Sequence, residues 1–191
     1  MAVGSAPADW LIVGLGNPGS EYAGTRHNVG FDVASLLAGR WGLPKPKEKF
    51  RALLTEGRIG PGAPRVAVLL PQTYMNEAGL SVGPARGAFK VPLERVLVIH
   101  DEIDLPFGEI RTRIGGGLAG HNGLKSVKDA LGSEEFARIR IGVGRPPTTD
   151  PDRVAAYVLS RFAEPRAEVA LVLERAADVA EQVAMGGQDP T

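Results

Sequence analysis

The stretch RVLVIHDEID, residues 95–104, decides the fold class, because a short apolar run leads directly into a group of ionisable side chains. An apolar run of this length predicts a buried β-strand over Arg95–Ile99. The polar residues that follow lie at the carboxyl end of this strand, which is where ligands bind in open α/β sheets. One segment therefore predicts both a central strand and a candidate site.

Strands and helices alternate on both sides of this segment. Trp10–Gly16 predicts a second buried strand, and Asn28–Gly42 has the apolar spacing of a helix. Further strands are predicted over 50–59, 65–70, 108–114 and 137–143, and further helices over 76–90, 122–131, 152–159 and 165–185, whereas 43–49 is interpreted as a polar loop. The alternation predicts an α/β fold, a single-domain three-layer sandwich in which helices flank a twisted, mixed and mostly parallel sheet.

The composition excludes several classes of protein. The 191 residues include no cysteine, which excludes disulfides, thiolate nucleophiles and cysteine-ligated metal sites. No apolar run reaches the roughly 18–20 residues of a membrane span. The N-terminus lacks the features of a secretion signal, so a cytoplasmic protein with no membrane partner is expected. Residues 1–9 are predicted to form an N-terminal extension, 10–186 the domain and 187–191 a C-terminal tail.

Scarce polar residues gather where predicted strands meet loops or where helices begin. The chain has three histidines and four asparagines, namely His27, His100, His121, Asn17, Asn28, Asn76 and Asn122. Asparagine also occurs at such positions for backbone reasons, as a helix cap or turn residue. Their joint occurrence with the histidines favours a common site.

His27 and Asp101 have the residue types of a base and its supporting carboxylate. His27 lies just before a predicted helix, whose N-terminus disfavours the imidazolium ion and predicts a lowered pKa. A carboxylate such as Asp101 fixes the tautomer of a catalytic histidine. A hydrolase built this way activates water with His27 and stabilises an oxyanion with asparagine amides. A zinc site formed by the three histidines and Asp101 is the alternative, but no metal-binding spacing supports it, and no metal is expected.

Two glycine-rich motifs suggest contacts with phosphate. GLGNPG, residues 14–19, fits a dinucleotide fingerprint, which leaves a nucleotide-dependent oxidoreductase as an alternative. Pro18 removes one N–H group, and the next predicted helix starts too late to bind a pyrophosphate. GGGLAGHNG, residues 115–123, is flanked by Arg111, Arg113, Lys125, Lys128, Arg138, Arg140 and Arg145, which form either a phosphate-binding surface or ordinary solvated charge.

Five motifs together resemble one family. They are IVGLGNPGSEYAGTRHNVGF (12–31), PQTYMNEAG (71–79), VIHDEIDLPFG (98–108), GGGLAGHNGLKS (115–126) and RIRIGVGRP (138–146). Their order is similar to that of bacterial-type peptidyl-tRNA hydrolase, over nearly the whole chain. The resemblance implies a monomeric hydrolase without cofactor or metal, whose partner is peptidyl-tRNA. Such an enzyme cleaves the ester between the peptide and the terminal ribose and recycles tRNA released from the ribosome.

The resemblance also implies roles for individual residues. His27 matches the catalytic base, Asp101 its supporting carboxylate, and Asn17 the residue that helps discriminate N-blocked substrates. Positions that match or are predicted to contact the peptide, the 3′ end or tRNA phosphate are Tyr22, Tyr74, Met75, Asn76, Asn122, His121, Arg113, Arg140 and Lys125. A non-catalytic tRNA-binding module is the remaining alternative. Leu118, Ala119 and Arg145 depart from the pattern expected for the family.

Overall fold

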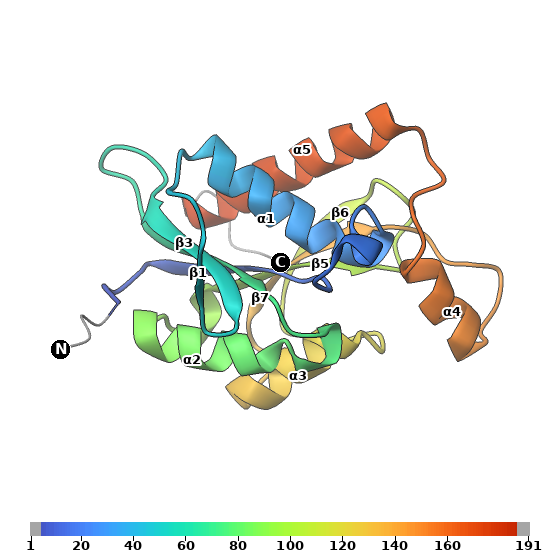
Figure 1. Ribbon diagram of the computed structural model, residues 1–191, viewed down its shortest axis with the longest axis horizontal. Coiled ribbons are helices and arrows are strands. Elements are labelled where there is room, and N and C mark those ends of the chain that lie inside the picture. The colour runs from blue at the N-terminus through green and yellow to red at the C-terminus, as the bar shows by residue number, and fades with distance from the viewer. Residues whose placement is uncertain (1–4, 187–191) are drawn as a thin grey trace.

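A seven-stranded sheet forms the centre of the protein, in the order β2-β3-β4-β1-β5-β7-β6 (Figure 1). The computed structural model describes residues 5–186, so the predicted tail 187–191 and the first four residues of the predicted extension lie outside the described residues. Strands β1, β2, β4, β5 and β7 run in one direction and β3 and β6 in the other, which confirms a mixed, mostly parallel sheet. The strands are β1 (Trp10–Gly14), β2 (Lys47–Lys49), β3 (Ala52–Arg58), β4 (Arg65–Pro71), β5 (Val96–Glu102), β6 (Ile110–Ile114) and β7 (Ala137–Gly142).

Helices cover both faces of the sheet, as the alternation predicted. α1 (Val29–Arg40) and α5 (Arg166–Ala184) lie on one face, and α2 (Gly79–Phe89) and α3 (Asn122–Leu131) lie on the other (Figure 1). Each face carries its own apolar core, so the molecule has three layers. The remaining α-helix, α4 (Pro151–Val158), has no buried residue and lies beside one end of the sheet (Figure 1). In the described part of the chain, no helix is long and apolar enough to cross a membrane.

Two differences from the predicted strands involve charged residues. Residues 47–49, interpreted as part of a polar loop, form the short edge strand β2, whose three side chains are all exposed. Charged residues on a short edge strand discourage pairing with another chain, and they also hide the strand from a hydrophobic-pattern search. Strand β5 continues to Glu102 rather than ending near Ile99, and Glu102 is buried.

The N-terminal end of α1 packs directly against the ends of two strands, backbone against backbone, with no side chain between them. A Cβ atom on Gly14 would lie 2.3 Å from the carbonyl oxygen of Gly30, and one on Gly30 would lie 2.3 Å from the carbonyl oxygen of Ile99. Hydrogen bonds join the same segments, from Leu15 N to Ile99 O at 3.1 Å and from Phe31 N to Leu15 O at 3.2 Å. The first turn of α1 is therefore held directly on the carboxyl ends of β1 and β5.

Candidate active site

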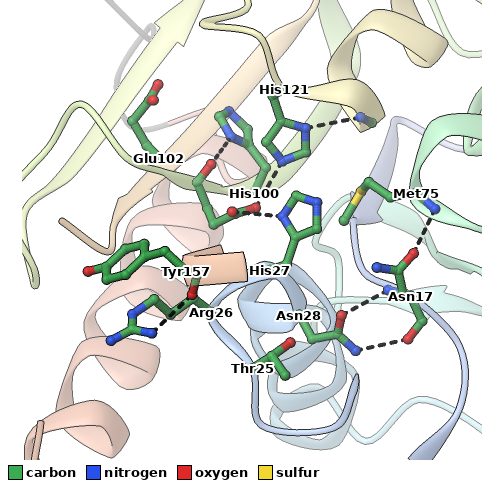
Figure 2. Close-up of polar contacts among 12 residues, drawn as sticks. Asn17, Thr25, Arg26, His27, Asn28, Met75, His100, Glu102, His121 and Tyr157 are labelled. Carbon is green, nitrogen blue, oxygen red and sulfur yellow. Dashed lines mark hydrogen bonds and ion pairs between the residues drawn. The ribbon is translucent and has the colours of Figure 1, made fainter. Parts of the chain in front are cut away.

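The turn that carries His27 is fastened to the GLGNPG turn by two asparagines. Asn17 N donates to Asn28 Oδ1 at 2.8 Å, and Asn28 Nδ2 donates back to Asn17 O at 2.9 Å (Figure 2). A 3₁₀ turn over Arg26–Asn28 precedes α1, which begins only at Val29. No α-helix starts at the glycines to receive a pyrophosphate, since only the 3₁₀ turn over Ser20–Tyr22 directly follows them, and this geometry disfavours the oxidoreductase alternative. The GLGNPG motif instead positions the turn that carries His27.

His27 and Asp101 form a hydrogen-bonded pair that joins the His27 turn to the end of β5. His27 Nδ1 lies 2.8 Å from Asp101 Oδ2 (Figure 2), and the histidine side chain is 13% exposed, so it reaches solvent without lying in bulk water. Burial works to lower the pKa of His27, but the charge and hydrogen bond of Asp101 outweigh it and the pKa is raised. The lowered pKa expected from the helix N-terminus was therefore wrong, because a nearby full charge exceeds the helix dipole.

Asp101 stays ionised although it is almost fully buried. Burial works to raise its pKa, but the charges and hydrogen bonds of His27 and His121 lower it well below its ordinary value. His100, the preceding residue, donates from Nδ1 to the carbonyl oxygen of Asp101 at 2.8 Å. Complete burial is the main reason that the pKa of His100 falls to about 3, so His100 is neutral and serves to hold the Asp101 backbone.

His121 has a double role that fixes its tautomer. Its Nδ1 accepts hydrogen bonds from Gly123 N at 3.1 Å and Leu124 N at 3.3 Å, which caps the N-terminus of α3. The proton of the neutral ring therefore sits on Nε2, which donates to Asp101 Oδ1 at 2.8 Å (Figure 2). Protonation of Nδ1 would place a donor against two backbone donors. His121 is thereby suited to orient Asp101 rather than to accept a proton.

The two roles of His121 can be separated by experiment. Asparagine is a good helix cap but is too short to reach Asp101. His121→Asn is therefore expected to retain most of the thermal stability and to lower kcat about tenfold, which corresponds to one lost hydrogen bond to a charged group. His121→Ala should lose about 1 kcal/mol of stability in addition. Equal kcat in His121→Asn and the wild type would contradict the orienting role.

The three central side chains also have the composition of a metal site. His27, Asp101 and His121 each offer a ligand atom, and these atoms lie within 4.8 Å of one another. The same atoms, however, are joined in N–H to carboxylate pairs at 2.8 Å, which use the nitrogen positions that a metal ion would need. The donor set is thus arranged as a hydrogen-bonded carboxylate with two imidazoles.

A cavity of about 800 Å³ opens beside the His27–Asp101 pair. The amide of Asn17 lies in its wall with Oδ1 held by Met75 N at 2.7 Å, which leaves Nδ2 as the free donor. The predicted site residues that line the cavity are Asn17, His27, Tyr74, Met75, Asn76, Asp101, His121 and Asn122. The cavity lining thus contains five of the seven histidines and asparagines that were predicted to converge, whereas Asn28 and His100 lie outside it and hold lining residues through hydrogen bonds.

Four predicted contact residues lie outside this cavity lining. Tyr22 belongs to a 3₁₀ turn over Ser20–Tyr22, and Lys125 is exposed on α3. Arg113 is partly buried beside Gly116 in the glycine-rich segment. The Nε of Arg140 donates to Glu102 Oε1 at 3.1 Å, so this guanidinium already has a buried partner.

Two arginines position the cavity walls in ways that the sequence did not reveal. Arg26 is buried, and its guanidinium lies 3.9 Å from the ring centre of Tyr157 and bonds to Tyr157 O at 3.0 Å, which attaches α4 to the His27 turn. Arg138 was grouped with the phosphate-binding cations, but it is buried and donates to the carbonyl oxygens of Gly115 and Gly117. It supports the glycine-rich segment before His121. The strand alternation of residues 137–142 indicated only which face Arg138 occupies.

Comparisons with known proteins agree with this architecture. A family model described as peptidyl-tRNA hydrolase matches residues 11–190. The chain is 50% identical to the peptidyl-tRNA hydrolase of Mycolicibacterium smegmatis over 183 residues, which cover 94% of this chain and 93% of the relative. It is 44% identical to that of Renibacterium salmoninarum, covering 93% and 92%. A crystal structure of peptidyl-tRNA hydrolase from Acinetobacter baumannii is similar with a TM-score of 0.83 and 39% identity, covering 96% of this chain and 93% of that one.

Proposed function

Since the chain belongs to the peptidyl-tRNA hydrolase family, it hydrolyses peptidyl-tRNA, and we propose that His27 is the general base of that reaction. The observation that carries the proposal is the 2.8 Å contact between His27 Nδ1 and Asp101 Oδ2 at the wall of the cavity. This contact places the proton of neutral His27 on Nδ1 and leaves the lone pair of Nε2 free. A base in this state can accept a proton from water.

The proposed reaction begins with the attack of water on the ester carbonyl carbon. Nε2 of His27 takes one proton from the water while its oxygen forms the new bond, and the carbonyl becomes a tetrahedral oxyanion. Asp101 stabilises the resulting imidazolium without taking a proton itself. The oxyanion then collapses, and the imidazolium returns the proton to the ribose oxygen as the ester bond breaks. A placed base of this kind contributes roughly 10²–10⁴-fold to the rate.

Asparagine amides are the proposed hydrogen-bond donors of the site. Asn17 offers a fixed Nδ2, since its oxygen is held by the backbone of Met75. Asn76 and Asn122 line the same cavity and are exposed, so their amides are accessible to a substrate. One donor aligned with a developing oxyanion contributes about 10²–10³-fold. We assign substrate and oxyanion binding to these three amides as a group.

The decisive test is turnover of N-acetylleucyl-tRNA with release of free tRNA. A dinucleotide-dependent oxidoreductase would bind NAD(P) without cleaving the ester. A non-catalytic module would bind tRNA in a salt-dependent manner and show no turnover. We also propose that the enzyme acts as a monomer in the cytoplasm, where translation produces its substrate.

The pH dependence follows from the raised pKa of His27. Only the neutral imidazole accepts a proton, and a raised pKa keeps the cation populated to higher pH. We therefore expect kcat/KM to fall as the pH is lowered, with a midpoint above the ordinary value of 6.5. A pH profile with N-acetylleucyl-tRNA measures this midpoint. A midpoint below 6.5 would mean that Asp101 does not stabilise the cation in solution.

Metal removal tests the zinc alternative. Because the three candidate ligands are bonded to one another, dialysis against EDTA is expected to leave kcat and KM unchanged. The control is EDTA-treated enzyme supplemented with Zn²⁺, which should gain no activity. Activity that is lost on chelation and restored by Zn²⁺ would show that the ring nitrogens coordinate a metal ion instead of transferring a proton.

A further inference from the structure

Arg145 is the single lysine or arginine among the cavity-lining residues of the described chain. Three neighbouring arginines are held elsewhere: Arg26 against Tyr157, Arg138 against glycine carbonyls and Arg140 against Glu102. The proposed reaction assigns no task to Arg145. Its position at the cavity is therefore unexplained by the chemistry at His27.

The positive charge of Arg145 is not cancelled by the acidic residues of the lining. Asp101 accepts hydrogen bonds from two imidazoles, and Glu102 is paired with Arg140 at 3.1 Å. Both carboxylates are buried and already have partners. An anion that enters the cavity therefore meets Arg145 as its available cationic group.

The backbone of Arg145 is fixed while its guanidinium is free to exchange partners. Val143 N donates to Glu102 O at 3.1 Å and Gly144 N to Leu105 O at 3.0 Å, which anchors the segment to the end of β5. The guanidinium contacts Asp104 at 2.8 Å, and the two side chains are 42% and 47% exposed. Exposed ion pairs of this kind contribute little to stability and are easily replaced.

We propose, on the basis of the proposed function, that Arg145 binds the phosphodiester attached to the 5′ oxygen of the 3′-terminal adenosine. This phosphate belongs to the same nucleotide as the scissile ester, so it is the anionic group of the tRNA that lies closest to the reacting carbonyl. On binding, the guanidinium exchanges the Asp104 carboxylate for the phosphate, with which it can form two parallel hydrogen bonds. Arg145 thus distinguishes a tRNA end from an uncharged ester.

The test compares two small esters that differ by one charge. They are 3′-O-(N-acetylleucyl)adenosine and the same ester of adenosine 5′-methylphosphate. For the wild type, the phosphodiester is expected to increase kcat/KM about tenfold, and for Arg145→Gln the ratio of the two values should fall to about one. Both compounds are also measured as competitive inhibitors of N-acetylleucyl-tRNA cleavage. If a compound binds without being cleaved, the ratio of the two inhibition constants replaces the ratio of the kcat/KM values.

Two control variants separate this role from general electrostatics. Arg153→Gln removes an exposed cation that lies on α4 outside the cavity lining, and it should keep the wild-type ratio. Asp104→Asn removes the competing carboxylate, and it should keep or increase the ratio. A ratio near one in the wild type, an unchanged ratio in Arg145→Gln, or no competition by either compound would overturn the inference. If the wild type does not cleave N-acetylleucyl-tRNA at all, the proposed function itself would be overturned.

Discussion

His27→Asn is expected to lower kcat by about 10²–10⁴-fold, which is the contribution of a placed general base. The amide of asparagine can occupy the region of Nδ1 and keep a donor toward Asp101, but it offers no atom in the place of Nε2. The variant therefore removes the base and preserves the environment of the buried carboxylate. Single-turnover hydrolysis of N-acetylleucyl-tRNA measures the loss.

Binding and folding serve as controls for this variant. The midpoint of its thermal unfolding should stay close to the wild-type value. Its affinity for N-acetylleucyl-tRNA whose ester is still intact should depend on salt concentration as it does in the wild type. A variant that binds tRNA and retains more than about a tenth of the wild-type kcat would contradict the role of His27, since a general base contributes at least 10²-fold.

Asp101→Asn is expected to lower kcat by about 10²–10⁴-fold, because the histidine loses the partner that fixes its tautomer. Asp101 accepts from two ring N–H groups, one on His27 and one on His121. An asparagine offers one acceptor and one donor, so one of the two rings must change its tautomer or lose its bond. The acid limb of the pH profile should also move to lower pH, because burial then acts on His27 without a compensating charge.

Glu102→Gln is the matched control for Asp101→Asn. Glu102 is the adjacent carboxylate on β5 and is also buried, but it pairs with Arg140. Its replacement should leave the midpoint of the acid limb in place. A similar displacement of the midpoint in both variants would show that the pKa of His27 responds to the general charge of the site rather than to its bond with Asp101.

Much of this site follows from sequence because strand ends in an α/β sheet converge. RVLVI predicted a buried strand, and the polar residues after it were therefore expected at a ligand-binding edge. The scarcity of histidine and asparagine made their joint placement informative. These grounds indicate His27 as a base and Asp101 as an orienting carboxylate, the resemblance to peptidyl-tRNA hydrolase implies that the two are partners, and the structure places them in contact.

The remaining features depend on contacts that a local pattern does not contain. The role of His121 as a cap depends on where α3 begins relative to β5. The pKa of His27 depends on a charge 74 positions away in the chain, which overrides the local effect of the helix. Arg138 and Arg140 alternate as strand residues do, but their partners come from a glycine-rich segment and a neighbouring strand.

The close approach of Gly14 and Gly30 determines where the proposed general base can lie. These residues set how near the His27 turn can come to the end of β5, since each of them has no space for a Cβ atom. A methyl group at either position would push the proton acceptor away from its carboxylate without touching the substrate. Turnover therefore depends on two glycines that lie beneath the cavity and do not contribute to its lining.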